Sequence, residues 1–123
     1  MNQEEAEKFV RNLFHDIWEG NNLDKFNDYY HPNIQADVGG KIIDFSEIKL
    51  HALTMKEQWL NTKVVFQDII SDGLDKIAVR FNMSGVKERI PVSFEMIGIY
   101  DIKDHKLHKI FGLSNPPMSY PQD

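Results

Sequence analysis

The sequence predicts an α+β domain in which three helices cover one face of an antiparallel sheet. In the first half of the chain, apolar residues recur at the spacing of about 3.6 residues that is typical of amphipathic helices. After Asn61 the spacing changes to two, and the segments become rich in branched and aromatic residues, as in strands. We therefore expect a single domain over residues 1–123, of which residues 116–123 form an extended C-terminal tail because Pro116 and Pro117 cannot continue a sheet ladder.

The first predicted helix covers residues 4–19. Acidic residues in its first turns suit the positive end of the helix dipole, and Gly20 provides a C-terminal stop. Its apolar stripe consists of Phe9, Val10, Leu13, Phe14, Ile17 and Trp18.

A second, shorter helix is predicted over residues 23–30. Asn22 can cap its start, and Pro32 ends it because the residue before a proline disfavours helix. A short strand over residues 34–38 follows, and it leads into a turn at Gly39-Gly40.

The third predicted helix begins after a possible short strand over residues 41–44. Ser46 is the expected N-cap, and the helix runs to about Leu60. Its apolar stripe consists of Ile48, Ala52, Met55 and Trp59.

Four strands are predicted in the second half of the chain. They correspond to the segments "TKVVFQDIIS", "KIAVRFNMS", "IPVSFEMIGIYDI" and "KLHKIFGLS". Turns at Asp72-Gly73, at residues 85–89 and at residues 103–105 separate them, so consecutive strands are expected to form hairpins.

Composition excludes several classes of function. The net charge of −5 gives no basic face for nucleic acid, and no apolar run has the length of a membrane span. The chain has no cysteine, which excludes disulfides and thiolate chemistry. The acidic, polar start "MNQEEAEKF" is unlike a secretory signal, so a cytoplasmic protein is expected.

Three segments resemble the SnoaL-like polyketide cyclases of the nuclear transport factor two-like superfamily: "WEGNNLDKFNDYYHPNI", "DGLDKIAVRFNMSG" and "VSFEMIGIYDIKDHKLHKIFGLSN". The resemblance implies a cone-shaped domain, in which a strongly bent antiparallel sheet wraps around three N-terminal helices and encloses an apolar pocket. It also implies homodimers through the outer face of the sheet. The superfamily includes isomerases, dehydratases and non-catalytic members, so the fold alone does not assign a function.

A binding pocket needs apolar walls and a few placed polar groups. Side chains that could supply the walls are Phe14, Trp18, Tyr30, Met55, Trp59, Phe94, Met96 and Phe111. The same residues could instead fill an ordinary core.

Asp37 is the leading candidate for a catalytic carboxylate. It lies close to the position at which the steroid isomerases of the superfamily carry their proton-transferring aspartate. A carboxylate against aromatic walls would be desolvated, and its pKa would rise towards neutrality. Alternatively, Asp37 is an exposed residue beside the Gly39-Gly40 turn.

The usual companions of such an aspartate are missing. Phe14 and Gly98 align with the tyrosine and the acid that stabilise an oxyanion in the isomerases, and neither has a donor. Phe111 and Asn115 align with the tryptophan and aspartate of the cyclases, and an amide has no proton to exchange near neutral pH. Asn115 could still orient a ligand carbonyl, or it could be a turn residue.

His51 borders the apolar stripe of the third helix, where a neutral imidazole could act as an auxiliary base. More often such a histidine is a helix-edge residue with a solvent or backbone partner. The histidines show no spacing typical of a zinc site, so no metal and no cofactor are expected.

Three functions remain open from the sequence. The first is a non-catalytic protein that binds a small hydrophobic carbonyl or polyketide-like molecule. The second is a cofactor-independent lyase, isomerase or cyclase that uses Asp37 as a proton shuttle. The third is a structural homodimer with an incidental cavity.

Overall fold

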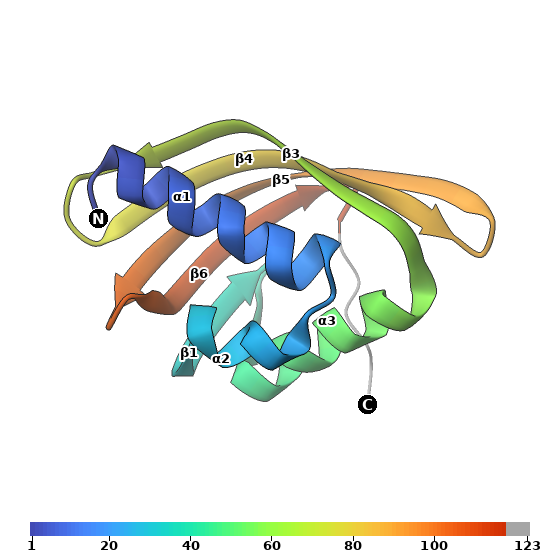
Figure 1. Ribbon diagram of the computed structural model, residues 1–123, viewed down its shortest axis with the longest axis horizontal. Helices are drawn as coiled ribbons and strands as arrows, with labels where there is room; N and C mark the ends of the chain where they lie inside the picture. The colour runs from blue at the N-terminus through green and yellow to red at the C-terminus, as the bar shows by residue number, and fades with distance from the viewer. Residues whose placement is uncertain (118–123) are drawn as a thin grey trace.

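The computed structural model describes residues 1–117, so residues 118–123 of the expected tail lie outside the described part. The predicted α+β class is confirmed. Three α-helices, α1 (Gln3–Leu13), α2 (Phe26–Tyr29) and α3 (Phe45–Gln58), lie on one side of a strongly bent, open sheet (Figure 1). In this part of the chain no helix is both long and apolar enough to cross a membrane.

The sheet contains six strands over the described residues: β1 (Tyr30–Val38), β2 (Lys41–Asp44), β3 (Trp59–Ser71), β4 (Lys76–Lys87), β5 (Ile90–Lys103) and β6 (Lys106–Asn115). Their spatial order is β2-β1-β6-β5-β4-β3. The hairpin pairs are antiparallel as expected, but β1 runs parallel to β6, so the sheet is mixed. The sequence pattern could not predict this parallel pair, because turn residues indicate only hairpins between consecutive strands and β1 and β6 are far apart in the chain.

The first helix begins and ends close to its predicted limits. Asn2 and Glu5 form a capping box at the start of α1. The helix then continues as a π-helix, η1 (Phe14–Glu19), in which the Gly20 amide donates to the carbonyl oxygen of His15, five residues earlier, at 2.8 Å. A Cβ at Gly20 would lie only 2.9 Å from that oxygen, so glycine suits this tight end.

The second helix is shorter than predicted. A 3₁₀ turn, η2 (Leu23–Lys25), precedes α2, and Tyr30 already belongs to β1. Pro32 therefore lies within a strand. It is tolerated there because β2 pairs only with residues 35–38 of β1, and the register to β6 is interrupted between Tyr30 and Gln35.

Helix α3 has a different cap from the predicted one. Asp44, not Ser46, is the N-cap, and its side chain accepts from the amide of Glu47 at 3.0 Å while Glu47 bonds back. Asp44 and Glu47, three residues later, thus form a capping box, and this pattern can be recognised in the sequence. At the other end, Trp59 begins β3, so the helix stops two residues before the predicted Leu60.

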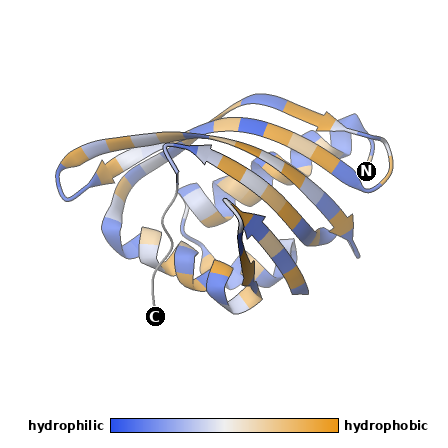
Figure 2. Cartoon of the chain, turned by 180° about the vertical axis from the view of Figure 1, so that it is seen from behind, coloured by the Kyte–Doolittle hydropathy of each residue, from blue (hydrophilic) through white to orange (hydrophobic). Residues whose placement is uncertain are grey.

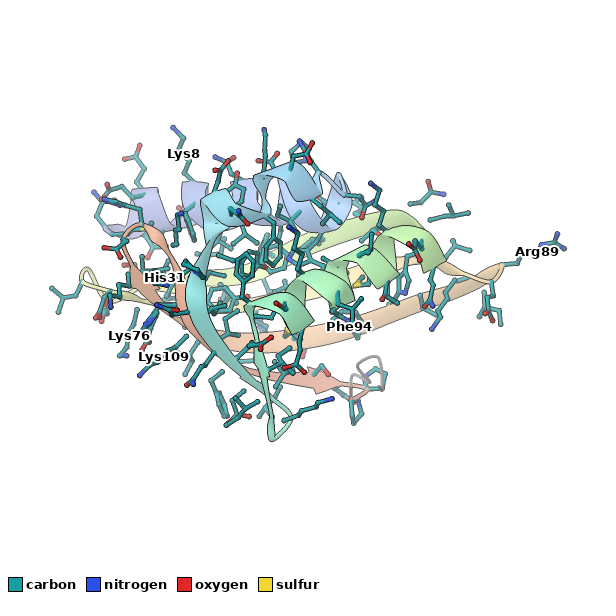
Figure 3. All side chains as sticks on the ribbon, turned by 90° about the horizontal axis from the view of Figure 1, so that it is seen from below. Lys8, His31, Lys76, Arg89, Phe94 and Lys109 are labelled. Carbon is teal, nitrogen blue, oxygen red and sulfur yellow. The ribbon has the colours of Figure 1, made fainter. Side chains whose placement is uncertain are left out.

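The turns between strands agree with their sequences. Positive φ angles occur at both central residues of Gly39-Gly40, Glu88-Arg89 and Asp104-His105, as mirror-image hairpin turns require. Arg89 consequently stands at the tip of the long β4–β5 hairpin (Figure 3).

The core lies between the helices and the concave face of the sheet. Apolar and polar residues alternate along the strands (Figure 2), and the apolar face meets the buried sides of α1, η1 and α3. The edge strand β3 is partly covered by the start of α1. The side-chain amide of Gln3 donates through its nitrogen to the Ile69 carbonyl and accepts through its oxygen from the backbone amide of Ser71. The cavity described below lies between this face of the sheet and the helices η1 and α3.

Candidate ligand-binding cavity

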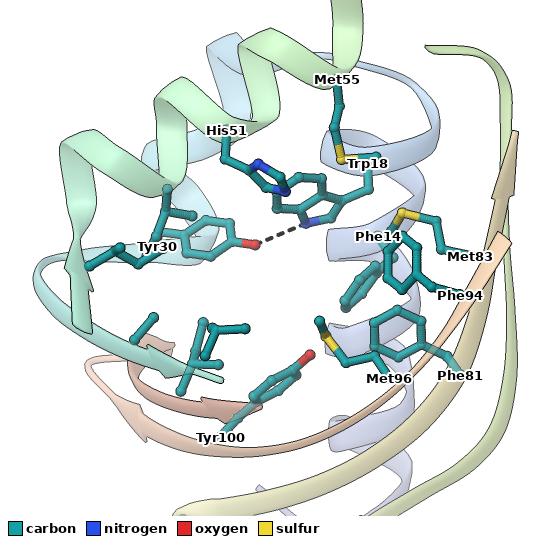
Figure 4. Close-up of a pocket in the computed structure, with 15 residues that line it drawn as sticks. Phe14, Trp18, Tyr30, His51, Met55, Phe81, Met83, Phe94, Met96 and Tyr100 are labelled. Atoms are coloured by element: carbon teal, nitrogen blue, oxygen red, sulfur yellow. Dashed lines mark hydrogen bonds between the residues drawn. The ribbon is translucent and has the colours of Figure 1, made fainter. Parts of the chain in front are cut away.

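A cavity of about 70 Å³ lies between the concave face of the sheet and the helices η1 and α3 (Figure 4). Most of its wall is aromatic or aliphatic, with three methionines on β4, β5 and α3. Six predicted wall residues do line it: Phe14, Trp18, Tyr30, Met55, Phe94 and Met96. Residues that sequence reasoning did not name include Phe81, Met83 and Tyr100.

The π-helix η1 supplies one aromatic wall. Phe14 and Trp18 project from it on the cavity side, and the Phe14 ring lies 4.7 Å from the ring of Phe81 on β4. The indole N–H of Trp18 donates to the hydroxyl oxygen of Tyr30 at 3.0 Å. This bond satisfies the indole donor inside the apolar wall and fixes the Tyr30 ring beside it.

His51 lines the cavity from the side of α3. On α3, Ile48, His51 and Met55 share the buried face at spacings of three and four residues. The His51 side chain is only 8% exposed, and its ring lies 5.8 Å from that of Trp18. Burial disfavours the charged imidazolium and lowers the pKa of His51 to about 4, so the ring is neutral at physiological pH.

Tyr100 forms the opposite wall. Its side chain is 3% exposed and points into the cavity from β5, across from the Trp18–Tyr30 pair (Figure 4). A sequence signal for it existed: Phe94 and Met96 were expected to face inward, and the same alternation continues to Gly98 and Tyr100.

Asp37 does not line the cavity. Its neighbours Ala36 and Val38 do, and successive residues of a strand point to opposite faces. The Asp37 carboxylate instead accepts a hydrogen bond from the Gly40 amide at 3.1 Å, within the Gly39-Gly40 turn. Asp37 therefore lies beside the turn, as in the alternative that the sequence left open, but it is half-buried and not exposed.

Three further predicted site residues also lie outside the cavity lining. The Trp59 ring packs beside Gly85, where a Cβ would come within 2.7 Å of it. Phe111 is half exposed on the outer face of the sheet, and Asn115 is exposed at the end of β6. Asn115 is therefore not positioned by the structure to orient a ligand in this cavity.

The structure offers no metal centre in the part it describes: residues 1–117 contain no group of three or more His, Asp or Glu side chains that could hold an ion. The polar groups at the cavity are the Trp18 N–H, the hydroxyls of Tyr30 and Tyr100 and the imidazole of His51. Such a site can form hydrogen bonds with a ligand, but the lining residues that the structure describes include no carboxylate to transfer a proton.

Neither protein-family models nor curated proteins match the chain. Solved structures do match over most of its length. IdmH from Streptomyces antibioticus, described as a candidate polyketide cyclase, has a TM-score of 0.77 and 13% identity over 90% of this chain and 92% of that chain. A candidate SnoaL-like polyketide cyclase from Jannaschia has a TM-score of 0.74 and 12% identity over 93% and 88% of the two chains. The protein has the SnoaL-like fold.

Proteins of different chemistry share this fold. An LEH-like epoxide hydrolase of M. tuberculosis matches with a TM-score of 0.76 and 13% identity, over 91% of this chain and 84% of that chain. The predicted resemblance is thus confirmed for the fold. Because fold does not determine chemistry, the function of this chain has to be inferred from its own cavity.

Proposed function

We propose that the protein binds a small hydrophobic molecule, such as a carbonyl compound or a polyketide-like aromatic, in the cavity beneath α3. The observation that carries the proposal is the composition of the wall, which is largely aromatic, aliphatic and thioether with a few neutral polar groups. Ligand sites typically have this combination of apolar area and sparse, placed polarity. The polyketide cyclases among the structural neighbours are consistent with such a ligand.

The enzymatic alternative, a cofactor-independent lyase, isomerase or cyclase, has less support from the geometry. Its proton shuttle would be Asp37, whose carboxylate bonds to the Gly40 amide outside the cavity lining. His51 does line the cavity, but a base with a pKa of about 4 abstracts protons poorly near pH 7. Binding without chemistry therefore remains the better proposal.

A thermal-shift screen against hydrophobic carbonyl compounds and polyketide-like aromatics tests the binding proposal. A ligand at a hundred times its Kd should stabilise the folded protein by about 2.7 kcal/mol. The variant Ala36→Leu, which fills space at the cavity wall, should lose this shift. Asp37→Asn is the matched control. Asp37 follows Ala36 in β1 but lies outside the cavity lining, so this variant should keep the thermal shift.

The proposal fails if no compound in the screen stabilises the wild-type protein. It also fails if Ala36→Leu binds every active compound as well as Asp37→Asn does, because the binding site would then lie elsewhere.

We further propose that the partner is a second copy of the chain, docked through the outer face of the sheet. Four apolar side chains gather there, each about half exposed: Ile97, Ile99, Phe111 and Leu113. Registers between β5 and β6 pair Ile97 with Leu113 and Ile99 with Phe111, so the four form one contiguous group, called here the outer patch. Exposed apolar groups of this kind are typical of interaction sites.

A further inference from the structure

The cavity has no charged wall. Among the described residues, those that line it include no Asp, Glu, Lys or Arg, and the one titratable imidazole, that of His51, is neutral at physiological pH. Its polar groups are two tyrosine hydroxyls, this imidazole and the indole N–H of Trp18, and the indole N–H already donates to Tyr30. A ligand that enters therefore meets dipoles and polarisable groups, but no counter-ion from residues 1–117.

The absence of a counter-ion discriminates between ligands of the same shape. A carboxylate that leaves water for a site without a cation loses its hydration and gains no ion pair, so it binds unfavourably. A neutral carbonyl or amide gives up much less hydration, and a single hydroxyl donor can compensate for it. Ligand charge, more than ligand outline, should decide affinity here.

The position of the Tyr100 ring depends on a glycine two residues earlier in β5. A Cβ built on Gly98 would lie 3.0 Å from Cε1 of Tyr100 and 3.4 Å from Cγ2 of Val79. The Tyr100 ring thus lies against the strand where Gly98 leaves space, two residues earlier on the same face of β5. This position directs its hydroxyl towards the interior of the cavity, across from Trp18 and Tyr30 (Figure 4).

We propose that the cavity selects small neutral ligands with a hydrogen-bonding group, that the Tyr100 hydroxyl holds this group, and that Gly98 positions Tyr100 to do so. Carboxylates of the same shape are excluded. The inference rests on the proposed binding function and narrows its ligand class. It makes Tyr100 a specificity-determining residue and Gly98 a positioning residue.

The test uses four single-ring probes with the full chain: acetophenone, benzamide, benzoate and ethylbenzene. Affinities are measured by ligand-observed NMR titration at pH 7.5, where His51 is neutral. We expect acetophenone and benzamide to bind, and benzoate to bind at least about 100-fold more weakly than its carboxamide. Loss of all binding in Ala36→Leu assigns the signals to the cavity.

Two variants then test the role of Tyr100. Tyr100→Phe removes only the hydroxyl and should weaken acetophenone about fivefold to tenfold while leaving ethylbenzene unchanged. Gly98→Ala, which displaces the Tyr100 ring, should weaken acetophenone similarly. A purely structural effect would weaken both probes together, and the melting temperature of each variant reports whether it folds.

The outcomes separate this inference from the binding proposal. If the probes bind but benzoate matches benzamide, or if Tyr100→Phe leaves acetophenone unaffected, the selection proposed here is wrong and the binding function stands. If no probe binds and the wider compound screen also fails, both proposals are overturned.

Discussion

His51 is a cavity residue whose burial makes the stability of the fold depend on pH. Its pKa is lowered from 6.5 to about 4 by burial, so the folded protein resists protonation while the unfolded chain does not. The stabilising contribution is therefore complete above pH 6.5 and is lost progressively as the pH falls towards 4. Acid should weaken the fold through this one side chain before most carboxylates titrate.

We predict that the free energy of unfolding falls by about 2 kcal/mol between pH 7.5 and pH 5 because of His51 alone. Urea unfolding of wild type and His51→Gln at both values measures this, and the variant should lack that part of the decrease. His105→Asn, at an exposed turn position, is the control and should retain it. Equal pH dependence in wild type and His51→Gln would contradict the prediction.

Asp37 has a structural role that an amide can replace. Its carboxylate accepts from the Gly40 amide, and the side-chain oxygen of asparagine can accept the same bond. We predict that Asp37→Asn changes stability by less than about 0.5 kcal/mol, and that Asp37→Ala costs about 1 kcal/mol. Chemical denaturation measures both, and a ligand affinity that drops in Asp37→Asn would support the proton-shuttle alternative instead.

The sequence already contained the evidence for placing Asp37. Ile34, Ala36 and Val38 alternate with polar residues along β1, which puts Asp37 on the face away from the core. The catalytic hypothesis came from the resemblance to an isomerase position and did not use this alternation. Local periodicity was the better guide at this site.

Phe111 shows what periodicity could not predict at the scale of a strand. In β6, Leu107 is buried, and strict alternation would put Phe111 on the same inner face. The register breaks between the pairs Ile102–Leu107 and Asp101–Lys109. Between these pairs β5 advances by one residue and β6 by two, so β6 contains one extra residue. This bulge shifts the phase, so Ile110 lines the cavity and Phe111 faces outward. Nothing in the local sequence identifies the extra residue.

The start of α3 gives a prediction at the scale of an element. Asp44 caps the helix and Glu47 completes the capping box, whereas Ser46 lies inside the first turn and is exposed. We predict that Asp44→Ala destabilises the protein by about 1 kcal/mol, because a helix amide loses its acceptor. Ser46→Ala should change stability by less than about 0.3 kcal/mol, since alanine favours helix at least as well.

Thermal unfolding of the two variants at pH 7.5 decides between the caps. A larger loss in Ser46→Ala than in Asp44→Ala would mean that the helix begins where the sequence pattern first indicated. The error at the sequence level arose because both residues are good caps, and only Asp44 has its acidic partner three residues later.

At the scale of the whole molecule, the bent sheet has two apolar faces with different roles. The concave face packs against the helices and encloses the cavity, while the outer patch of Ile97, Ile99, Phe111 and Leu113 is covered by nothing within residues 1–117. Arg80, which lies opposite Ile97 in the register between β4 and β5, is paired with Asp68 at 2.8 Å. A second copy could therefore cover the patch beside Ile97 without leaving the Arg80 guanidinium unpaired.

We predict that the wild-type protein elutes with twice its chain mass of 14.4 kDa, measured by size-exclusion chromatography with light scattering. Ile97→Glu should yield monomers, because a carboxylate buried at the centre of the interface raises the dimer Kd by at least about 100-fold. Leu74→Glu, which places the same charge at an exposed residue outside the outer patch, should remain dimeric. Unchanged melting of the Ile97→Glu monomer would show that the domain folds alone. A monomeric wild type, or a dimer that tolerates Ile97→Glu as well as Leu74→Glu, would mean that the outer patch is not where two copies meet.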